Sequence, residues 1–139
     1  MATPSPSDYL EIQNLYAWYN LCSDAGDAEG YADCFTADGE MVLPSRDMRI
    51  IGRSDLVAYK VTDKNSRLDV YRRHWNASMH LDQLDATTIR GRAYYAGYNG
   101  VPGALPGMTS CGVYTDTIVR TPSGWRFKSR LLEIDGRAS

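Results

Sequence analysis

Residues 68–81 read LDVYRRHWNASMHL, and three stretches of the same kind follow: ATTIRGRAYYAGY (86–98), TSCGVYTDTIVR (109–120) and GWRFKSRLLEI (124–134). In each of them, residues that favour strands alternate with polar ones at a period of two. Polar or Gly/Pro-containing segments at 82–83, 99–108 and 121–124 separate the four stretches. The pattern predicts four consecutive strands of an antiparallel sheet.

These predicted strands are about twice as long as an ordinary strand of five or six residues. Long strands bend or carry bulges, and glycine is common where they do so. We therefore expect a highly curved sheet whose regular pairing is interrupted at Gly91, Gly97 and Gly112.

Helices are predicted for the first part of the chain. Apolar residues recur at helical spacing from Ser7 to Ser23, and Ser7 or Asp8 is the expected N-cap. Asp27 is a natural cap for a short second helix that runs through Phe35 and ends before the turn at 38–39. The first forty residues therefore predict a helical hairpin.

A short strand and a third helix connect this hairpin to the strand-rich half. Glu40 to Leu43 predicts the strand, and Ser54 is the expected N-cap of a helix within residues 52–61. Helices followed by strands give an α+β fold. We expect a cone-shaped antiparallel sheet, with the helical hairpin and the third helix enclosing a pocket.

The size of the chain fits a single domain, because 139 residues lie within the usual range for one hydrophobic core. We expect one domain over residues 1–139, in which residues 1–7 form a flexible tail rich in Pro and Ser. The composition includes ten Tyr against two Phe. Tyrosine combines an apolar ring with a polar tip, so this bias favours ligand handling.

The charge distribution argues against a nucleic-acid partner. The 15 basic residues are scattered, the 17 acidic residues outnumber them, and the net charge is −2. No apolar run approaches the length of a membrane span, and residues 1–7 lack the features of a signal peptide. We expect a cytoplasmic protein that does not bind membranes.

Neither a disulfide nor a metal site is predicted. Cys22, Cys34 and Cys111 form no C-x-x-C pair and are interpreted as reduced, mostly buried thiols. His74 and His80 do not have the i, i+4 spacing of a helical zinc site. No glycine-rich phosphate loop is present either, so we expect no cofactor and no metal.

One constellation of residues has the chemistry of a site. Tyr16, Asn20 and Asp24 stand at i, i+4 and i+8 of the first helix, so that they can face one place. In the first long strand, one face is polar (Arg72, His74, Asn76, Ser78) and the other is mainly apolar (Tyr71, Trp75, Ala77, Met79, Leu81). The polar face of the strand is either exposed to solvent or lines the interior of the cone. The alternation of residues does not distinguish between these two orientations.

Five short motifs, in this order and spacing, resemble the SnoaL-like family of the nuclear-transport-factor-2-like superfamily. They are Ile12-Gln13-Asn14-Leu15-Tyr16, Asp24, Phe35-Thr36-Ala37-Asp38-Gly39, Arg73-His74-Trp75-Asn76 and Gly124-Trp125-Arg126-Phe127. The resemblance covers most of the chain and implies a cone of curved sheet plugged by helices. In its site pattern the chain is most similar to the dehydrochlorinase and scytalone dehydratase members.

The resemblance also implies roles for individual residues. Asp24 and His74 fall where those members have a catalytic pair, in which the histidine removes a proton from carbon and the aspartate orients its ring. The aspartate is then expected to raise the pKa of His74. Arg130 falls at an active-site arginine, whereas Tyr19 replaces a lysine of the dehydrochlorinase, which disfavours dehalogenation.

The remaining candidate residues are expected to bind substrate. They are Tyr16, Tyr19, Asn20, Asn76, Tyr95, Tyr114 and Arg130, and one of the four tyrosines is expected to act as the acid. Two interpretations of the function stay open. The first is a cofactor-independent lyase or isomerase of the dehydratase or cyclase type, which acts on a hydrophobic oxygenated cyclic substrate such as a polyketide, terpenoid or steroid. The second is a non-catalytic small-molecule-binding or assembly module on the same fold.

Self-association is also expected. Trp75, Met79 and Leu81 are predicted on the outer face of the sheet, where they need to be covered, so we expect a homo-oligomer, either a dimer or a trimer.

Overall fold

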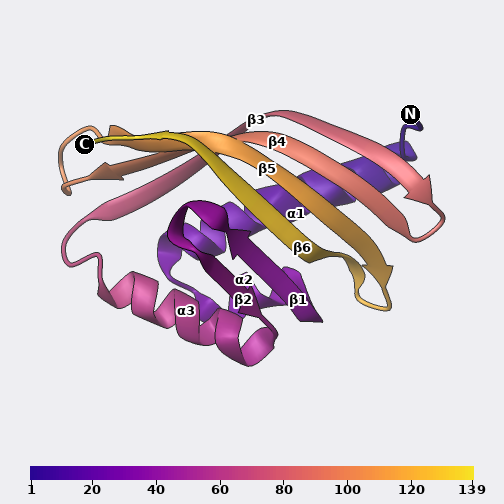
Figure 1. The fold of residues 1–139 in the computed structure, drawn as a ribbon, viewed down its shortest axis with the longest axis horizontal. Coiled ribbons are helices and arrows are strands. Elements are labelled where there is room, and N and C mark those ends of the chain that lie inside the picture. The colour runs from indigo at the N-terminus through magenta and orange to yellow at the C-terminus, as the bar shows by residue number, and fades with distance from the viewer.

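Three helices pack against a strongly curved six-stranded sheet in the computed structural model, which describes residues 1–139 (Figure 1). The helices are α1 (Pro6–Ala25), α2 (Ala28–Asp33) and α3 (Arg53–Asn65). The strands are β1 (Phe35–Leu43), β2 (Met48–Ile51), β3 (Tyr71–Asp85), β4 (Thr88–Gly100), β5 (Gly107–Thr121) and β6 (Gly124–Arg137), and a 3-10 turn, η1 (Pro44–Arg46), joins β1 to β2. The predicted α+β cone is confirmed.

The sheet has the strand order β2-β1-β6-β5-β4-β3. All neighbouring strands run antiparallel except β1 and β6, which are parallel. The long strands β3 to β6 arch over α1, whereas α2, α3 and the short β1–β2 pair lie at one side below the arch (Figure 1). The concave side of the sheet is therefore covered by helices.

The first helix starts earlier than predicted. Its N-cap is Ser5, whose side chain accepts a hydrogen bond from the backbone N–H of Asp8, and Pro6 occupies the first turn, where a missing N–H costs nothing. Ala2, in the segment 1–7 that was expected to be a flexible tail, forms hydrogen bonds with Asp82 and Gln83 of β3. At the other end, Gly26 takes the left-handed conformation, at φ 73°, that terminates the helix.

The second predicted helix is shorter and gives way to a strand. Asp27 caps α2 as expected, but α2 ends at Asp33, and Phe35 already pairs with Phe127 of β6. Pairing with a strand far along the chain outweighs the local turn signal at 38–39. Strand β2 was not predicted from the sequence, since it is only four residues long and contains a single buried residue, Ile50.

The cap of α3 also differs from the prediction. Gly52 is the N-cap, at φ 88°, and no side chain accepts a hydrogen bond there, so Ser54 lies inside the helix instead of capping it. The helix then extends four residues beyond the predicted end at Val61.

A bulge in β3 changes which residues face the helices. Pairing with β4 shifts by one residue between Ala77 and His80, and Ser78 within that segment has φ 54°. One extra residue reverses the alternation, so His74 and Asn76 face inward before the bulge, and Met79 and Leu81 face inward after it. Leu81 is only 4% exposed, and the prediction that Met79 and Leu81 share the outer face with Trp75 is wrong.

The hairpin between β3 and β4 lies further along than expected. Residues 82–83 continue the strand, and the chain turns at 86–87, where the Asp85 carboxylate accepts the backbone N–H of Thr87. A register shift between Gln83 and Asp85 allows the strand to continue past the polar pair.

Two of the three expected glycine irregularities are confirmed. Pairing shifts between Gly97 and Tyr98 and between Cys111 and Gly112. Gly91 pairs regularly with Asp116. Its lack of a side chain leaves room for the Tyr16 hydroxyl instead. A Cβ at this position would collide with the Tyr16 hydroxyl and would approach Ile118 at 3.0 Å.

The core is one cluster of 21 buried hydrophobic residues contributed by the sheet and by all three helices. Ile12, Leu56, Ile89, Ile118 and Phe127 are completely buried.

None of the helices is both long and apolar enough to cross a bilayer. Of the three free cysteines, Cys22 and Cys34 are buried and Cys111 is exposed.

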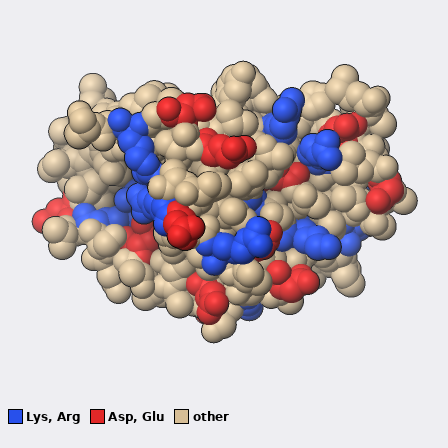
Figure 2. Space-filling model, viewed as in Figure 1, with Lys and Arg blue, Asp and Glu red and all other residues tan.

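Charged residues of both signs are interspersed on the face of the molecule shown in Figure 2. Some of them connect elements: the Arg53 guanidinium of α3 lies 2.6 Å from both Glu29 and Asp33 of α2. Because these groups are largely exposed, such pairs contribute little to stability.

Candidate active site

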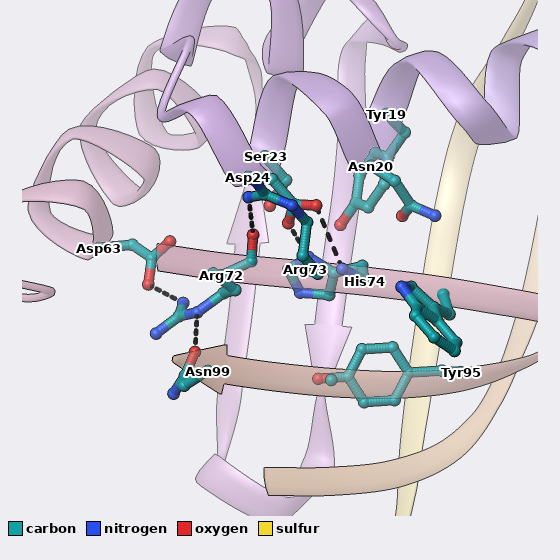
Figure 3. A network of polar contacts seen from close by, with 12 residues as sticks. Tyr19, Asn20, Ser23, Asp24, Asp63, Arg72, Arg73, His74, Tyr95 and Asn99 are labelled. Carbon is teal, nitrogen blue, oxygen red and sulfur yellow. Dashed lines mark hydrogen bonds and ion pairs between the residues drawn. The ribbon is translucent and has the colours of Figure 1, made fainter. Parts of the chain in front are cut away.

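The last turn of α1 meets β3 at Asp24 and His74 (Figure 3). The ring Nδ1 of His74 lies 2.5 Å from Oδ1 of Asp24, and the backbone N–H of His74 donates to Oδ2 of the same carboxylate at 3.1 Å. The two side chains are only 12% and 10% exposed. The predicted contact between these two residues is therefore present in the structure.

This contact determines which nitrogen of His74 is available for chemistry. The carboxylate can only accept hydrogen bonds, so Nδ1 carries the proton and Nε2 keeps its lone pair. Burial lowers the pKa of His74 below its ordinary value of 6.5, and the hydrogen bond and charge of Asp24 oppose this effect without cancelling it. Asp24 thus raises this pKa as expected, but the net shift is downward because desolvation is the larger effect. His74 is thus a neutral base at pH 7.

His74 lines a cavity of about 270 Å³ enclosed by α1, α2, α3 and the concave side of the sheet. Its wall is rich in tyrosine and in aliphatic side chains. The tyrosines are Tyr19, Tyr31, Tyr59, Tyr95, Tyr98 and Tyr114, and the aliphatic residues are Met41, Leu43, Leu132 and Ile134. The rest of the wall is polar and carries charges of both signs, among them Arg46, Lys60, Asp63, Arg72 and Arg137.

Three of the predicted substrate-binding residues line this cavity: Tyr19, Tyr95 and Tyr114. The Tyr95 ring lies 5.6 Å from the His74 ring, and its hydroxyl lies 3.0 Å from Ser110 Oγ. Burial raises the pKa of Tyr19 and of Tyr114 well above the ordinary value of 10, so both hydroxyls stay protonated and act as hydrogen-bond donors.

Three other predicted residues lie outside the cavity. Tyr16, Asn20 and Asn76 border a separate groove between α1 and β3. Asn20 Nδ2 donates to Asn76 Oδ1 at 2.8 Å, and Asn76 Nδ2 donates to the backbone carbonyl of Tyr94 at 3.1 Å. These amides hold the helix against the strand, so the structure does not place them where they would contact a ligand in the cavity.

Arg130 is not in the cavity wall either. It is completely buried, forms two hydrogen bonds of 2.9 and 3.0 Å to Asp116, and stacks 3.7 Å from the centre of the Tyr114 ring. The Tyr16 hydroxyl donates to the same Asp116 carboxylate. Arg130 thus does not line the cavity, whereas Tyr19 and Tyr114, on whose rings it stacks, do.

A cluster of charged residues beside the Asp24–His74 pair, which we call the dyad, was not predicted from the sequence. Asp63 of α3 accepts hydrogen bonds from Lys60 at 2.9 Å and from Arg67 at 2.6 Å. It also accepts one from Arg72 at 2.7 Å (Figure 3). Burial raises the pKa of Asp63, but the three cations outweigh it and hold that pKa well below its usual value. The signal in the sequence was the spacing of Leu56, Lys60 and Asp63, which puts charges on the buried stripe of a helix.

Arg67 connects this cluster to the dyad. Its Nη1 donates to the backbone carbonyl of Asp24 at 2.8 Å, and its Nη2 donates to the carbonyl of Ser23 at 2.7 Å. Both carbonyls lie at the C-terminal end of α1, where a cation is favourable. Arg67 therefore anchors the turn that presents Asp24 to His74.

The chain's metal-ligating side chains are dispersed. No group of three or more His, Cys, Asp or Glu side chains is gathered closely enough to hold a metal ion.

Comparison with known proteins identifies a family. The model of the SnoaL-like domain matches residues 5–131. Similar solved structures include Aln2 from a Streptomyces species, at 25% identity and a TM-score of 0.88, with 96% of this chain and 95% of that chain covered. ActVI-ORFA from Streptomyces coelicolor matches at 25% identity and a TM-score of 0.81, with coverage of 91% and 96%.

A protein from Catenulispora acidiphila, solved in complex with S-DNPA, has 27% identity to this chain and a TM-score of 0.81, with 94% of this chain and 96% of that chain covered. No curated protein matches the sequence.

Proposed function

Because the chain belongs to the SnoaL-like domain family, we propose that it is a cofactor-independent lyase or isomerase in which His74 removes a proton from a carbon next to a carbonyl group. The observation that carries this proposal is the double contact of Asp24 with His74. It fixes the tautomer and the orientation of the imidazole, which are the requirements for a positioned general base. The histidine and aspartate are those that the likeness to the dehydrochlorinase and scytalone dehydratase members singles out.

In the proposed step, Nε2 of His74 takes the proton and the electron pair of the C–H bond moves onto the carbonyl oxygen, giving an enolate. Asp24 then stabilises the imidazolium that forms. Return of the proton to another carbon completes an isomerisation, and departure of a β-hydroxyl group as water, with that proton, completes a dehydration. Both outcomes balance without an oxidant or reductant.

The walls of the cavity indicate the class of substrate. Six tyrosines and four aliphatic residues favour a flat ring, and the polar and charged side chains of the same wall favour oxygen substituents on that ring. The volume, about 270 Å³, lies just below the range of about 300 to 1,000 Å³ for ligand pockets, so a compact ring system fits best. A polyketide-like cyclic ketone has this chemistry. The complex of the Catenulispora acidiphila protein with S-DNPA supports a ligand-holding role for this fold.

Hydrogen exchange at carbon tests the proposal without knowledge of the natural substrate. The probe is 2-tetralone, a bicyclic aromatic ketone with acidic C–H bonds beside its carbonyl, incubated with the protein in D2O and followed by proton NMR. The wild-type protein is expected to accelerate deuterium incorporation above the buffer rate. In the His74→Ala variant, the acceleration should fall by about 10²- to 10⁴-fold.

His80→Ala is the matched control, because His80 is the other histidine of the same strand and is exposed outside the cavity. It should exchange like the wild type. Equal exchange in His74→Ala and the wild type would refute the proposal. Tight binding of 2-tetralone without catalysed exchange in any variant would instead favour a non-catalytic ligand-binding module.

A further inference from the structure

The buried lysine of the cavity wall has no role in the proton transfer described above. Lys60 is 4% exposed, and its ammonium donates to Ser23 Oγ and to Asp63 Oδ2, both at 2.9 Å. An ammonium has three donors, and no protein oxygen accepts the third. The nitrogen lies 4.6 Å from the centre of the Tyr31 ring and 5.3 Å from that of Tyr59, and all three residues line the cavity.

Lys60 is not needed to neutralise Asp63. Arg67 and Arg72 already bind the two oxygens of that carboxylate, at 2.6 and 2.7 Å. With Lys60, the cluster holds three positive charges against the one negative charge of Asp63. Burying a lysine without a matching anion is costly, and burial lowers the pKa of Lys60 to about 8 despite the opposing effect of Asp63.

The ammonium shares the cavity with the proposed base. Lys60 and His74 both line it, and the positive charge of Lys60 contributes to the lowered pKa of His74. A ring held among the tyrosines thus has a proton acceptor at one side and a free N–H of a cation at another.

We propose that Lys60 forms an oxyanion subsite, in which its third N–H binds an ionised ring oxygen of the ligand, namely a phenolate or the enolate formed when His74 removes a proton. The natural substrate is then a compact aromatic or cyclic ketone or phenol whose acidic oxygen points at α3. The enolate part of this inference rests on the proposed function, whereas the binding of a phenolate does not.

The chromophoric phenol 4-nitrophenol measures this subsite directly, because its ionised form absorbs at longer wavelength. A cation within about 4 to 6 Å shifts the pKa of an acidic group by about 1 to 3 units. The pKa of bound 4-nitrophenol is therefore expected to fall by about 1 to 3 units in the wild-type protein. In Lys60→Met, which removes the charge and keeps an unbranched side chain of similar length, it should return to the solution value or rise above it.

Two controls separate loss of charge from loss of structure. The methyl ether 4-nitroanisole cannot ionise, so its affinity for Lys60→Met should equal that for the wild type if the cavity is intact. Lys128→Met removes an exposed lysine of β6 and should leave the bound pKa of 4-nitrophenol as in the wild type.

The wild-type measurement alone can overturn the inference, since an unchanged or raised pKa of the bound phenol would mean that no cation faces it. A shift that survives in Lys60→Met but disappears in Arg46→Gln would also overturn it, because the arginine of η1 at the cavity mouth would then be the responsible cation.

Turnover provides the link to catalysis. With 2-tetralone, Lys60→Met should lower kcat for exchange by about 10²- to 10³-fold with little change in KM, as expected for a group that binds only the developing oxyanion. A lowered phenol pKa without any catalysed exchange would refute the proposed function and leave the subsite standing. Catalysed exchange with an unchanged pKa of the bound phenol would refute the oxyanion subsite and leave the proposed function standing.

Discussion

The carboxylate of Asp24 accepts both hydrogen bonds that His74 directs toward α1, one from its ring Nδ1 at 2.5 Å and one from its own backbone nitrogen at 3.1 Å. A single side chain therefore orients the imidazole and also fixes the strand that carries it. Arg67 extends this relationship, because it binds the backbone carbonyl of Asp24 at 2.8 Å from the far side.

Asp24→Asn should lose nearly as much exchange activity as His74→Ala. An asparagine keeps the shape but removes the charge that stabilises the imidazolium and holds the tautomer, so a loss approaching about 10²- to 10⁴-fold in kcat is expected. The double variant should be little worse than either single variant, because the two residues act as one unit. Multiplicative losses in the 2-tetralone exchange assay would mean that they act independently.

The pH profile of exchange should be bell-shaped. The base must be neutral, and burial lowers the pKa of His74 below 6.5, so activity should be retained down to pH 6.5 and lost only at lower pH. On the alkaline side, the Lys60 ammonium loses its proton near its pKa of about 8, and activity should decline there. Exchange rates measured across this pH range, after subtraction of the rate in buffer alone, give both the acid and the alkaline limb of the profile. An acid limb with a midpoint above 6.5 would show that Asp24 outweighs burial.

Arg130→Met should strongly destabilise the protein. The substitution leaves Asp116 as an uncompensated buried charge, which costs about 3 to 5 kcal/mol of unfolding free energy in such pairs. Urea unfolding followed by tryptophan fluorescence measures it. Adding Asp116→Asn should recover part of the loss, because it removes the stranded charge and keeps an acceptor for Tyr16. If the single variant is as stable as the wild type, the buried pair is not a structural requirement.

Gly91→Ala should destabilise by about 1 to 3 kcal/mol, the usual cost of overpacking. The added methyl group would collide with the Tyr16 hydroxyl and with Ile118, beside the buried Asp116. Gly136→Ala is the matched control on a strand, because no atom lies within 4 Å of the added Cβ there. Equal unfolding free energies for the two variants would show that Tyr16 moves aside freely.

Self-association is predicted through the outer face of β3 and β4. Trp75 and Tyr94 are 60% and 59% exposed there, and the strand register places them on neighbouring strands. Light scattering at micromolar concentration should report a dimer or trimer, and Trp75→Arg should shift it toward the monomer. A wild-type protein that stays monomeric would contradict this prediction. Met79 and Leu81 do not support it, because they face inward.

Pattern and propensity in the sequence were enough to predict the first helix, the four long strands and the α+β class. These features depend on periodicity within a segment, which neighbouring residues set. The contact between Asp24 and His74 was also predictable, because the order of the motifs resembles a family whose fold brings the two together. Asp27 as a cap, and irregular pairing at Gly97 and Gly112, follow from local chemistry in the same way.

Only the tertiary structure decided where the other side chains point. The bulge between Ala77 and His80 reverses the inward face of β3, although nothing in the alternation of the segment marks it. The burial of Arg130 and the gathering of Lys60, Arg67 and Arg72 around Asp63 depend on elements far apart in the chain. A buried charge is stable only with partners that packing supplies, so its place and its pKa are properties of the folded protein rather than of any single segment.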